Sequence, residues 1–402
     1  MIPELRQKFN ASFKRETYER MVDWLAEQHD NRPAFPIAET PVFIPDGLRD
    51  RIMRACEEIT NDLTHVDFKE LSKKALVPDQ MMPDDPDHTH FLQMDFAVCR
   101  DERGELTPRL IEIQGFPSLY FYQDLLARAY REHFDLPDEM RSYFGGLDQE
   151  SYRELMRHHI VGDSDPKRVV LLEIEPEKQK TSIDFAVTRD ILGIKVLCLG
   201  DLKRDGRKLY YLDEAGERIP VERIYNRVIF DELLQRPDLQ REFYFKESAD
   251  VKWIGHPHWF FRISKHTMPL LRSEFVPDCH YLNELDHWPT DLENYVLKPL
   301  YSFAGSGVQL DVTPELLDAI EDRKNYILQR KVEYVPVVET PGAPAKCEIR
   351  MLMIWEEAAA RPRIINNLVR LSKGKMIGVD HNKGMDWVGG SIGLFNPINA
   401  GE

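Results

Sequence analysis

The sequence lacks the motifs that identify several common enzyme classes. It has no GxSxG nucleophile motif, no GxxxxGK[ST] phosphate-binding loop and no GxGxxG motif opening a strand–helix unit. These absences argue against the usual serine hydrolases, P-loop enzymes and dinucleotide-binding enzymes. The five cysteines are widely spaced and include no CxxC pair, which indicates reduced, mostly structural thiols.

Long apolar runs and an excess of positive charge are also missing. No stretch approaches the roughly 20 apolar residues that a membrane span needs. The formal net charge of −16 argues against a nucleic acid as the main partner, because phosphate binding requires surplus lysine and arginine. The first 28 residues are charged and helix-periodic, without a signal-peptide pattern, so we expect a cytoplasmic protein. The sequence does not indicate the oligomeric state.

The order of predicted elements indicates an α/β (α+β) fold. The first 80 residues have helical periodicity, and a strand hairpin follows a proline and aspartate loop at residues 81–90. Strands then alternate with helices from residue 167, which predicts a small parallel sheet with one antiparallel hairpin. We therefore divide the 402 residues into a helical N-terminal segment (1–90), a hairpin with helices (91–165), a small α/β substrate domain (166–250) and ATP-binding lobes (251–402).

Residues 294–308 are the most informative stretch. An apolar strand ends in Lys298 and Pro299 and runs into a loop of small residues, which include Ser302, Gly305, Ser306 and Gly307. A lysine beside such a loop can place a cation and free backbone N–H groups around a polyphosphate. An ordinary strand-to-helix turn would have the same composition.

Two further segments favour nucleotide binding. Residues 259–271 form an aromatic and apolar run that holds one lysine, Lys265. Residues 326–332 have the pattern of a buried strand and lead into a proline-containing loop. A plain core strand is the alternative for residues 326–332, and both interpretations can hold together.

In these segments the chain resembles the ATP-grasp ligases, in particular the circularly permuted branch with glutathionylspermidine synthase and eukaryotic glutathione synthetase. Ser264-Lys265 followed by an apolar Met-Pro-Leu-Leu run matches the first ATP-binding lysine segment of that branch, and Lys298-Pro299 matches the second. The resemblance covers about residues 90–385. It implies an ATP-grasp architecture in which residues 302–307 form a lid and residues 329–332 form the hinge beside adenine.

The resemblance also implies a magnesium site on the predicted hairpin. Asp95 and Glu112 match the two acidic positions, and Gln114 stands where the family has asparagine. Such oxygen donors suit magnesium bound with ATP, although both acids could instead be solvent-facing residues of an amphipathic ribbon. Gln93 replaces an arginine and Ala304 replaces an acidic residue of the family, which argues against glutathione itself as the substrate.

The remaining roles follow from the same resemblance. Arg370 is the best match for an arginine near the transferred phosphoryl group, with Arg350 as its rival; either could instead pair with Glu348 across the sheet. Asp231 and Glu232 match acids that face an amine, or they simply begin a helix. The expected ATP contacts are Lys265, Lys298, Ser302, Gly305, Ser306, Gly307, Gln329, Lys331 and Val332, and the expected substrate contacts are Ser118, Arg227, Asp231, Glu232 and Arg350.

The histidine pairs do not indicate a zinc site. His88 and His90 follow three aspartates, and His256 and His258 form an HxH pair. Neither pattern comes with the HExxH or paired CxxC spacing that defines a zinc geometry.

The sequence thus predicts an ATP- and magnesium-dependent ligase that joins a small-molecule carboxylate to an amine through an acyl phosphate. We expect neither nucleic acid nor membrane as a partner. One alternative is a nucleotide-binding pseudoenzyme or scaffold on the same fold. Another is an unrelated α/β binding protein in which the lysine loop is coincidental.

Overall fold

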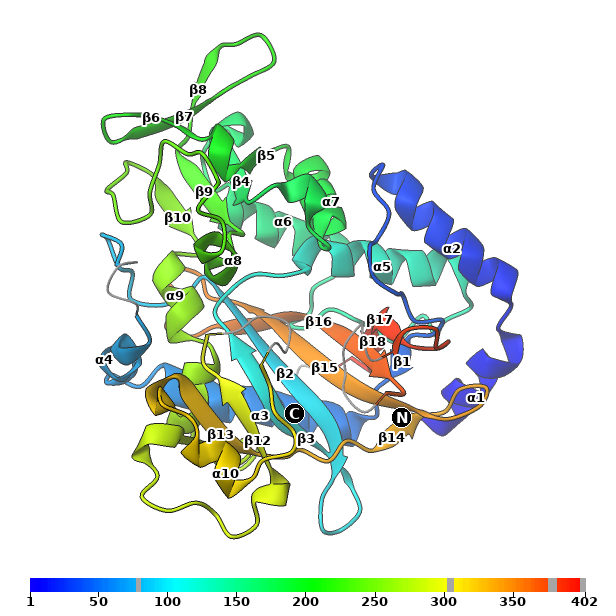
Figure 1. The fold of residues 1–402 in the computed structure, drawn as a ribbon. Helices are drawn as coiled ribbons and strands as arrows, with labels where there is room; N and C mark the ends of the chain where they lie inside the picture. Colours follow the sequence, from blue (N-terminus) through cyan, green and yellow to red (C-terminus); the bar gives the residue numbers. More distant parts are fainter. Residues whose placement is uncertain (77–80, 302–306, 375–381, 398–402) are drawn as a thin grey trace.

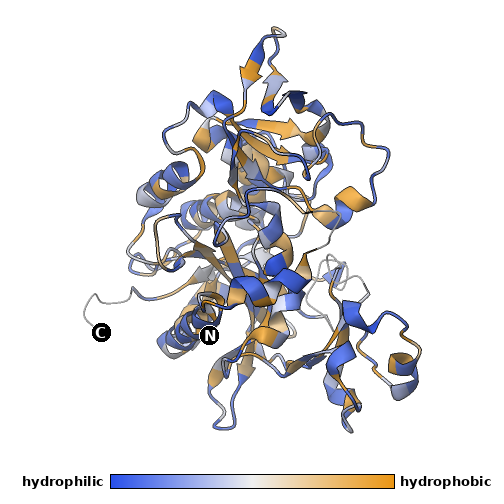
Figure 2. Ribbon diagram, turned by 90° about the vertical axis from the view of Figure 1, so that its left-hand side faces the viewer, coloured by the Kyte–Doolittle hydropathy of each residue, from blue (hydrophilic) through white to orange (hydrophobic). Residues whose placement is uncertain are grey.

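The computed structural model describes residues 1–76, 81–301, 307–374 and 382–397 (Figure 1). The fold is α+β, as the sequence predicts, with several separate sheets. Within the described ranges, no helix has both the length and the apolar character needed to cross a membrane. Figure 2 shows that apolar residues concentrate on the strands in the interior of the molecule.

A large antiparallel sheet forms the centre of the fold. Its strand order is β17-β16-β15-β2-β3, and β14 also pairs with β15. The strands are β2 (Phe91–Arg100), β3 (Leu106–Gln114), β14 (Pro336–Val338), β15 (Ala345–Ile354), β16 (Arg363–Ser372) and β17 (Gly389–Ser391). The predicted hairpin of β2 and β3 is confirmed. It pairs with C-terminal strands that the sequence-based division placed in another part of the chain.

Helices cover both faces of this sheet (Figure 1). Helix α5 (Tyr120–His133) packs on one face with Phe91 and Leu352, and helix α3 (Asp46–Leu63) packs on the other with Met94 and Met351. Strands covered on both faces lose the alternation of polar and apolar residues. Nine of the ten residues of β2 and of β15 are accordingly buried.

The N-terminal segment is largely helical, as predicted. It contains α1 (Pro3–Ser12), α2 (Arg15–Gln28), α3 and the short α4 (Phe68–Leu71). A two-residue strand, β1 (Val42–Phe43), interrupts the helices and pairs in parallel with β18 (Gly393–Leu394). The two ends of the chain are thereby joined beside the large sheet.

A smaller α/β unit follows the helix α6 (Gln149–Ile160). Its four strands are all parallel in the order β10-β9-β4-β5, and a separate antiparallel sheet contains β6, β7 and β8. The unit contains β4 (Val169–Glu173), α7 (Ser182–Leu192), β5 (Lys195–Cys198), β6 (Lys203–Asp205), β7 (Lys208–Leu212), β8 (Arg218–Pro220), β9 (Arg223–Asn226), α8 (Phe230–Leu234) and β10 (Lys252–Ile254). The predicted parallel sheet is confirmed, and the predicted hairpin gains a third strand.

A buried carboxylate joins this unit to the large sheet. Asp184 of α7 accepts hydrogen bonds from the backbone N–H groups of Leu119, Phe121 and Tyr122, at 2.9 to 3.1 Å. These groups begin helix α5, where unpaired N–H groups favour a negative charge. The side chain of Asp184 is 0% exposed, so this cap lies wholly inside the protein.

A third sheet, with the order β11-β13-β12, forms a small lobe beside the β2–β3 hairpin (Figure 1). The lobe and its approach contain α9 (Pro257–Arg262), β11 (Cys279–Tyr281), β12 (Tyr295–Pro299), α10 (Pro314–Asp318) and β13 (Tyr326–Arg330). Leu297 and Leu328 point into the lobe's own core, whereas Ile327 packs with residues of the large sheet. Because side chains alternate along a strand, Lys298 and Gln329 lie on the face toward the large sheet.

Candidate functional site

Four strands of the large sheet bring charged residues to one face. Asp95 of β2 lies opposite both Glu112 of β3 and Arg350 of β15, and Glu348 of β15 lies opposite Arg370 of β16. Directly opposite residues share a face, and so do residues two apart on a strand. The five side chains therefore form one row across the sheet, which no single stretch of sequence reveals.

The row contains a network of buried ion pairs. Arg350 donates from Nε and Nη2 to the two oxygens of Asp95, both at 2.6 Å, and Arg370 Nη2 donates to Asp95 Oδ2 at 2.7 Å. Arg370 also pairs with Glu348. The side chains of Asp95 and Glu348 are 2% and 5% exposed, whereas that of Arg370 is 36% exposed. Arg370 is thus the arginine that reaches toward solvent, and Arg350 is enclosed.

Two neutral side chains add hydrogen bonds to this network, and sequence reasoning missed the role of Tyr334. Gln93 accepts a hydrogen bond from Arg350 Nη1 at 3.1 Å, and the hydroxyl of Tyr334 donates to Glu348 Oε2 at 3.1 Å. Burial raises the pKa of Glu348, and the two arginines oppose that shift. Burial acts to lower the pKa of Arg370, but Glu348 and Asp95 more than reverse this, so the guanidinium stays charged. The alternative named for these arginines, pairing with Glu348 across the sheet, is therefore present in Arg370.

The predicted magnesium ligands Asp95, Glu112 and Gln114 lie on neighbouring strands, but they differ in how many lone pairs remain free to bind a cation. Glu112 and Gln114 are two residues apart on β3 and are half-buried. Asp95 already accepts three guanidinium N–H groups, which leaves it little capacity for a cation. A carboxylate and an amide oxygen are the donor types that magnesium prefers. The donor set therefore fits a hard divalent cation best at Glu112 and Gln114.

One candidate lysine, Lys298, contacts the strand that bears Glu112. Lys298 Nζ donates to the carbonyl oxygen of Ile111 at 3.2 Å and so bridges the small lobe to β3. Burial lowers the pKa of Lys298; Glu112 opposes the shift and the charge of Lys265 adds to it. Lys265 is 8% exposed and begins the 3-10 helix Lys265–Leu270, which Ser264 caps. Both lysines and Glu112 therefore share one neighbourhood.

The predicted hinge residues Gln329, Lys331 and Val332 differ in burial and in their hydrogen-bond partners. Gln329 is 1% exposed, and its Oε1 accepts no hydrogen bond from the described residues. Lys331 instead donates from Nζ to the carbonyl oxygen of Glu293 at 2.6 Å. Val332 is half-buried. Gln329 is the hinge side chain with free hydrogen-bonding capacity on the described part of the chain.

The glycine-rich loop is only partly described. Ser302, Gly305 and Ser306 lie outside the described residues. Gly307 has a φ of +75°, and a Cβ there would lie 3.0 Å from Pro299 Cγ. A side chain at this position would be both strained and crowded, so the return of the loop onto β12 requires glycine.

The predicted substrate residues do not form one group. Asp231 lines a cleft of about 670 Å³, and its pKa is raised by burial, with Lys265 opposing the shift. Glu232 instead accepts a hydrogen bond from Gln179 at 3.0 Å, so the expected acidic pair does not face one ligand. The cleft walls include Phe261, His266, Tyr281, Leu300, Tyr301 and Lys324.

Two further predicted substrate residues have partners inside the protein. Arg227 forms a 3.0 Å ion pair with Asp184, in which the two side chains are 3% and 0% exposed. The backbone oxygen of Ser118 accepts a hydrogen bond from Gln93 at 2.9 Å. Arg227 thus stabilises the joint between α7 and α5, and sequence alone gave no sign of its partner.

Comparison with known proteins shows a similarity of structure without one of sequence. A glutathione synthetase-like effector from Globodera pallida, solved in its apo form, superposes with a TM-score of 0.56 at 13% identity, over 95% of this chain and 96% of that chain. No family model matches the sequence, and no curated protein matches it. At this identity the likeness concerns the fold alone. The chain has a fold like that of this glutathione synthetase-like effector.

Proposed function

We propose that this protein is an ATP-dependent carboxylate–amine ligase that forms an amide bond and releases ADP and phosphate. The observation that carries the proposal is the contact of Lys298 with the Ile111 carbonyl on β3, next to Glu112, at a place where the charge of Lys265 also acts on Lys298. The likeness in fold to a glutathione synthetase-like protein supports it. ATP and magnesium are the cofactors proposed on this basis.

The polar residues of the site have distinct roles in this proposal. Lys265 and Lys298 bind the phosphates of ATP, and Glu112 with Gln114 holds the magnesium ion that neutralises their charge. Arg370, held by Asp95 and Glu348, directs its guanidinium at the transferred phosphoryl group and stabilises the charge that develops there. Residues 329–332 would line adenine through backbone contacts.

The reaction needs positioning more than covalent chemistry by the protein. The substrate carboxylate attacks the γ-phosphorus of ATP, ADP leaves, and an acyl phosphate forms. The amine then attacks the acyl carbon, loses a proton and displaces phosphate. The chain supplies fixed cations and a site between two sheets, which raise the effective concentration of the reactants. The cleft at Asp231 is the proposed place for one of the two small substrates.

Thermal unfolding with a non-hydrolysable ATP analogue and magnesium, alone and together, tests the nucleotide site. We expect stabilisation of the wild type that needs both ligands. The variants Lys298→Met and Glu112→Gln should lose it, because each removes a charge that the complex requires. Lys208→Met is the matched control, since Lys208 is exposed on β7 in a separate sheet. No stabilisation of the wild type would refute the assignment.

A second candidate function is nucleotide binding without turnover. It is favoured by Asp95, whose oxygens already accept three guanidinium N–H groups. A ligase should release ADP when it is given a suitable pair from a panel of small carboxylates and amines. A protein that binds the ATP analogue with magnesium but releases no ADP across such a panel would fit the second function.

A further inference from the structure

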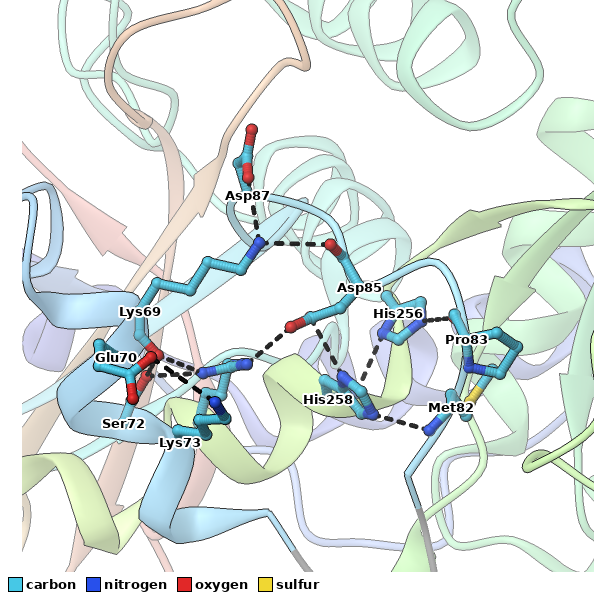
Figure 3. Close-up of polar contacts among 11 residues, drawn as sticks. Lys69, Glu70, Ser72, Lys73, Met82, Pro83, Asp85, Asp87, His256 and His258 are labelled. Carbon is cyan, nitrogen blue, oxygen red and sulfur yellow. Dashed lines mark hydrogen bonds and ion pairs between the residues drawn. The ribbon is translucent and has the colours of Figure 1, made fainter.

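A cluster of two histidines and an aspartate lies outside the proposed site. Asp85 belongs to the loop before β2, whereas His256 and His258 lie at the start of α9 (Figure 3). Potential ligand atoms of the three residues lie within 4.8 Å of one another, and the histidines are 2% and 1% exposed. This composition would suit a transition metal such as zinc.

The hydrogen-bond partners of His258 argue against a metal there. The backbone N–H of Met82 donates to His258 Nε2 at 2.8 Å, so Nε2 carries no proton. The proton of the neutral ring is then on Nδ1, which faces Asp85 Oδ1 at 3.1 Å. A metal bound at Nδ1 would require the proton on Nε2, directly against the N–H of Met82.

His256 and the second oxygen of Asp85 have hydrogen-bond partners as well. The carbonyl oxygen of Pro83 can only accept, so His256 Nε2, at 3.2 Å, carries the proton. His256 Nδ1 accepts from the backbone N–H of His258 at 3.2 Å. The second oxygen of Asp85 accepts from Arg262 Nη2 at 2.7 Å. The cluster is therefore linked by these hydrogen bonds and by the 3.1 Å contact between His258 Nδ1 and Asp85 Oδ1. We call it the α9 clamp: Asp85, His256, His258 and Arg262.

The α9 clamp also reaches the N-terminal helices. Arg262 is 3% exposed, and its Nη1 donates to the carbonyl oxygen of Lys69 at 2.5 Å and to Ser72 Oγ at 3.2 Å. A buried guanidinium with several partners fixes the position and rotation of the helix that carries it. Helix α9 is thus held from two directions, by the loop at Asp85 and by the segment Phe68–Leu71 with the residues that follow it.

The held helix leads directly to a candidate ATP-binding lysine. Helix α9 ends at Arg262, and Lys265 begins the next helix three residues later. The intervening Ile263 accepts a hydrogen bond from the backbone N–H of Gly115, at the end of β3, at 2.9 Å. The position of Lys265 relative to Glu112 therefore depends on how α9 is held.

We propose that the α9 clamp is a positioning device for Lys265, with Asp85 as its central residue, and that it binds no metal. The inference rests on the proposed role of Lys265 in nucleotide binding. A lysine held in place loses less conformational freedom when it binds phosphate, and so contributes more affinity. The N-terminal segment, which lies outside the family resemblance, thereby becomes part of the nucleotide site.

The variant Asp85→Asn tests the proposal, and Asp87→Asn is its matched control. Asp87 belongs to the same loop and pairs with Lys69 at 3.0 Å, but its side chain is 97% exposed. We expect Asp85→Asn to weaken binding of the ATP analogue with magnesium by about ten-fold and to speed hydrogen exchange in residues 263–271. Asp87→Asn should change neither, and Asp85→Glu should restore part of the affinity. Equal behaviour of Asp85→Asn and Asp87→Asn would overturn the proposal.

Nitrogen NMR of the histidine rings gives a readout that is independent of nucleotide. We expect the proton on Nδ1 of His258 and on Nε2 of His256, and no change when zinc alone is added to the wild type. Stoichiometric zinc binding, or the opposite protonation of His258, would overturn the clamp. If the wild type binds no nucleotide, the proposed function fails, while hydrogen exchange and the ring protonation still decide whether the clamp holds residues 263–271.

Discussion

Replacing Arg350 by leucine should leave a buried carboxylate without its main partner. The variant loses both contacts at 2.6 Å with Asp95 and the 3.1 Å hydrogen bond to Gln93. Asp95 is 2% exposed, so water cannot replace the guanidinium. Breaking a buried pair from one side costs about 3–5 kcal/mol. Because Arg370 still pairs with Asp95, we expect the lower end, roughly 3 kcal/mol.

Urea unfolding of Arg350→Leu, Asp95→Asn and the double variant measures this cost. The double variant leaves no unpaired charge at this pair, so its loss of unfolding free energy should be smaller than the sum of the two single losses. Arg363→Leu is the control, because Arg363 is about half exposed on β16, and its pair with Glu356 should contribute less than about 1 kcal/mol. If Arg350→Leu costs no more than Arg363→Leu, or if the losses are additive, the reasoning is wrong.

Two further predictions concern burial elsewhere in the fold. Burial raises the pKa of Glu173 to about 8 from its ordinary 4.5, so the folded state holds a proton that the unfolded state has lost, and stability should fall as pH rises between these values. Glu173→Gln has no such proton to lose, so its unfolding free energy should not fall in this way. Relative to the wild type, its unfolding free energy in urea should therefore rise with pH between these values, by up to about 1.4 kcal/mol per pH unit. A difference that stays constant with pH would contradict the burial argument. Gly115→Ala would place a Cβ 2.4 Å from the carbonyl oxygen of Trp259, and we expect thermal unfolding to show a loss of about 1–3 kcal/mol. Gly47→Ala, where nothing lies within 4 Å, is the control and should not destabilise.

Local pattern was enough to predict most elements of this fold. The hairpin of β2 and β3, the parallel strands β4 and β5 and the helix α5 all have apolar spacing that matches their structure. The apolar spacing of each segment is visible within a few residues of sequence, which is the range that periodicity reports. The pairing of Asp95 with Glu112 followed from the hairpin in the same way.

Contacts between distant segments could not be predicted from pattern. Arg350 lies 255 positions after Asp95, and nothing near Arg350 in the sequence indicates that it saturates this carboxylate. The same holds for Arg227, predicted to contact substrate, whose partner Asp184 is 43 positions away. Such pairs are set by how sheets and helices pack, so a charged residue's exposure and its remaining hydrogen-bonding capacity appear only in the folded structure.

The cap that Asp184 provides has a mechanical consequence. One carboxylate from α7 holds the first turn of α5 and the guanidinium of Arg227, which follows β9. A shift of the parallel sheet must therefore carry α5 with it, and α5 lies against the same large sheet that bears Glu112 and Arg370. A ligand that displaces the α/β unit would therefore shift the charged row of the large sheet through helix α5, without any loop changing its shape.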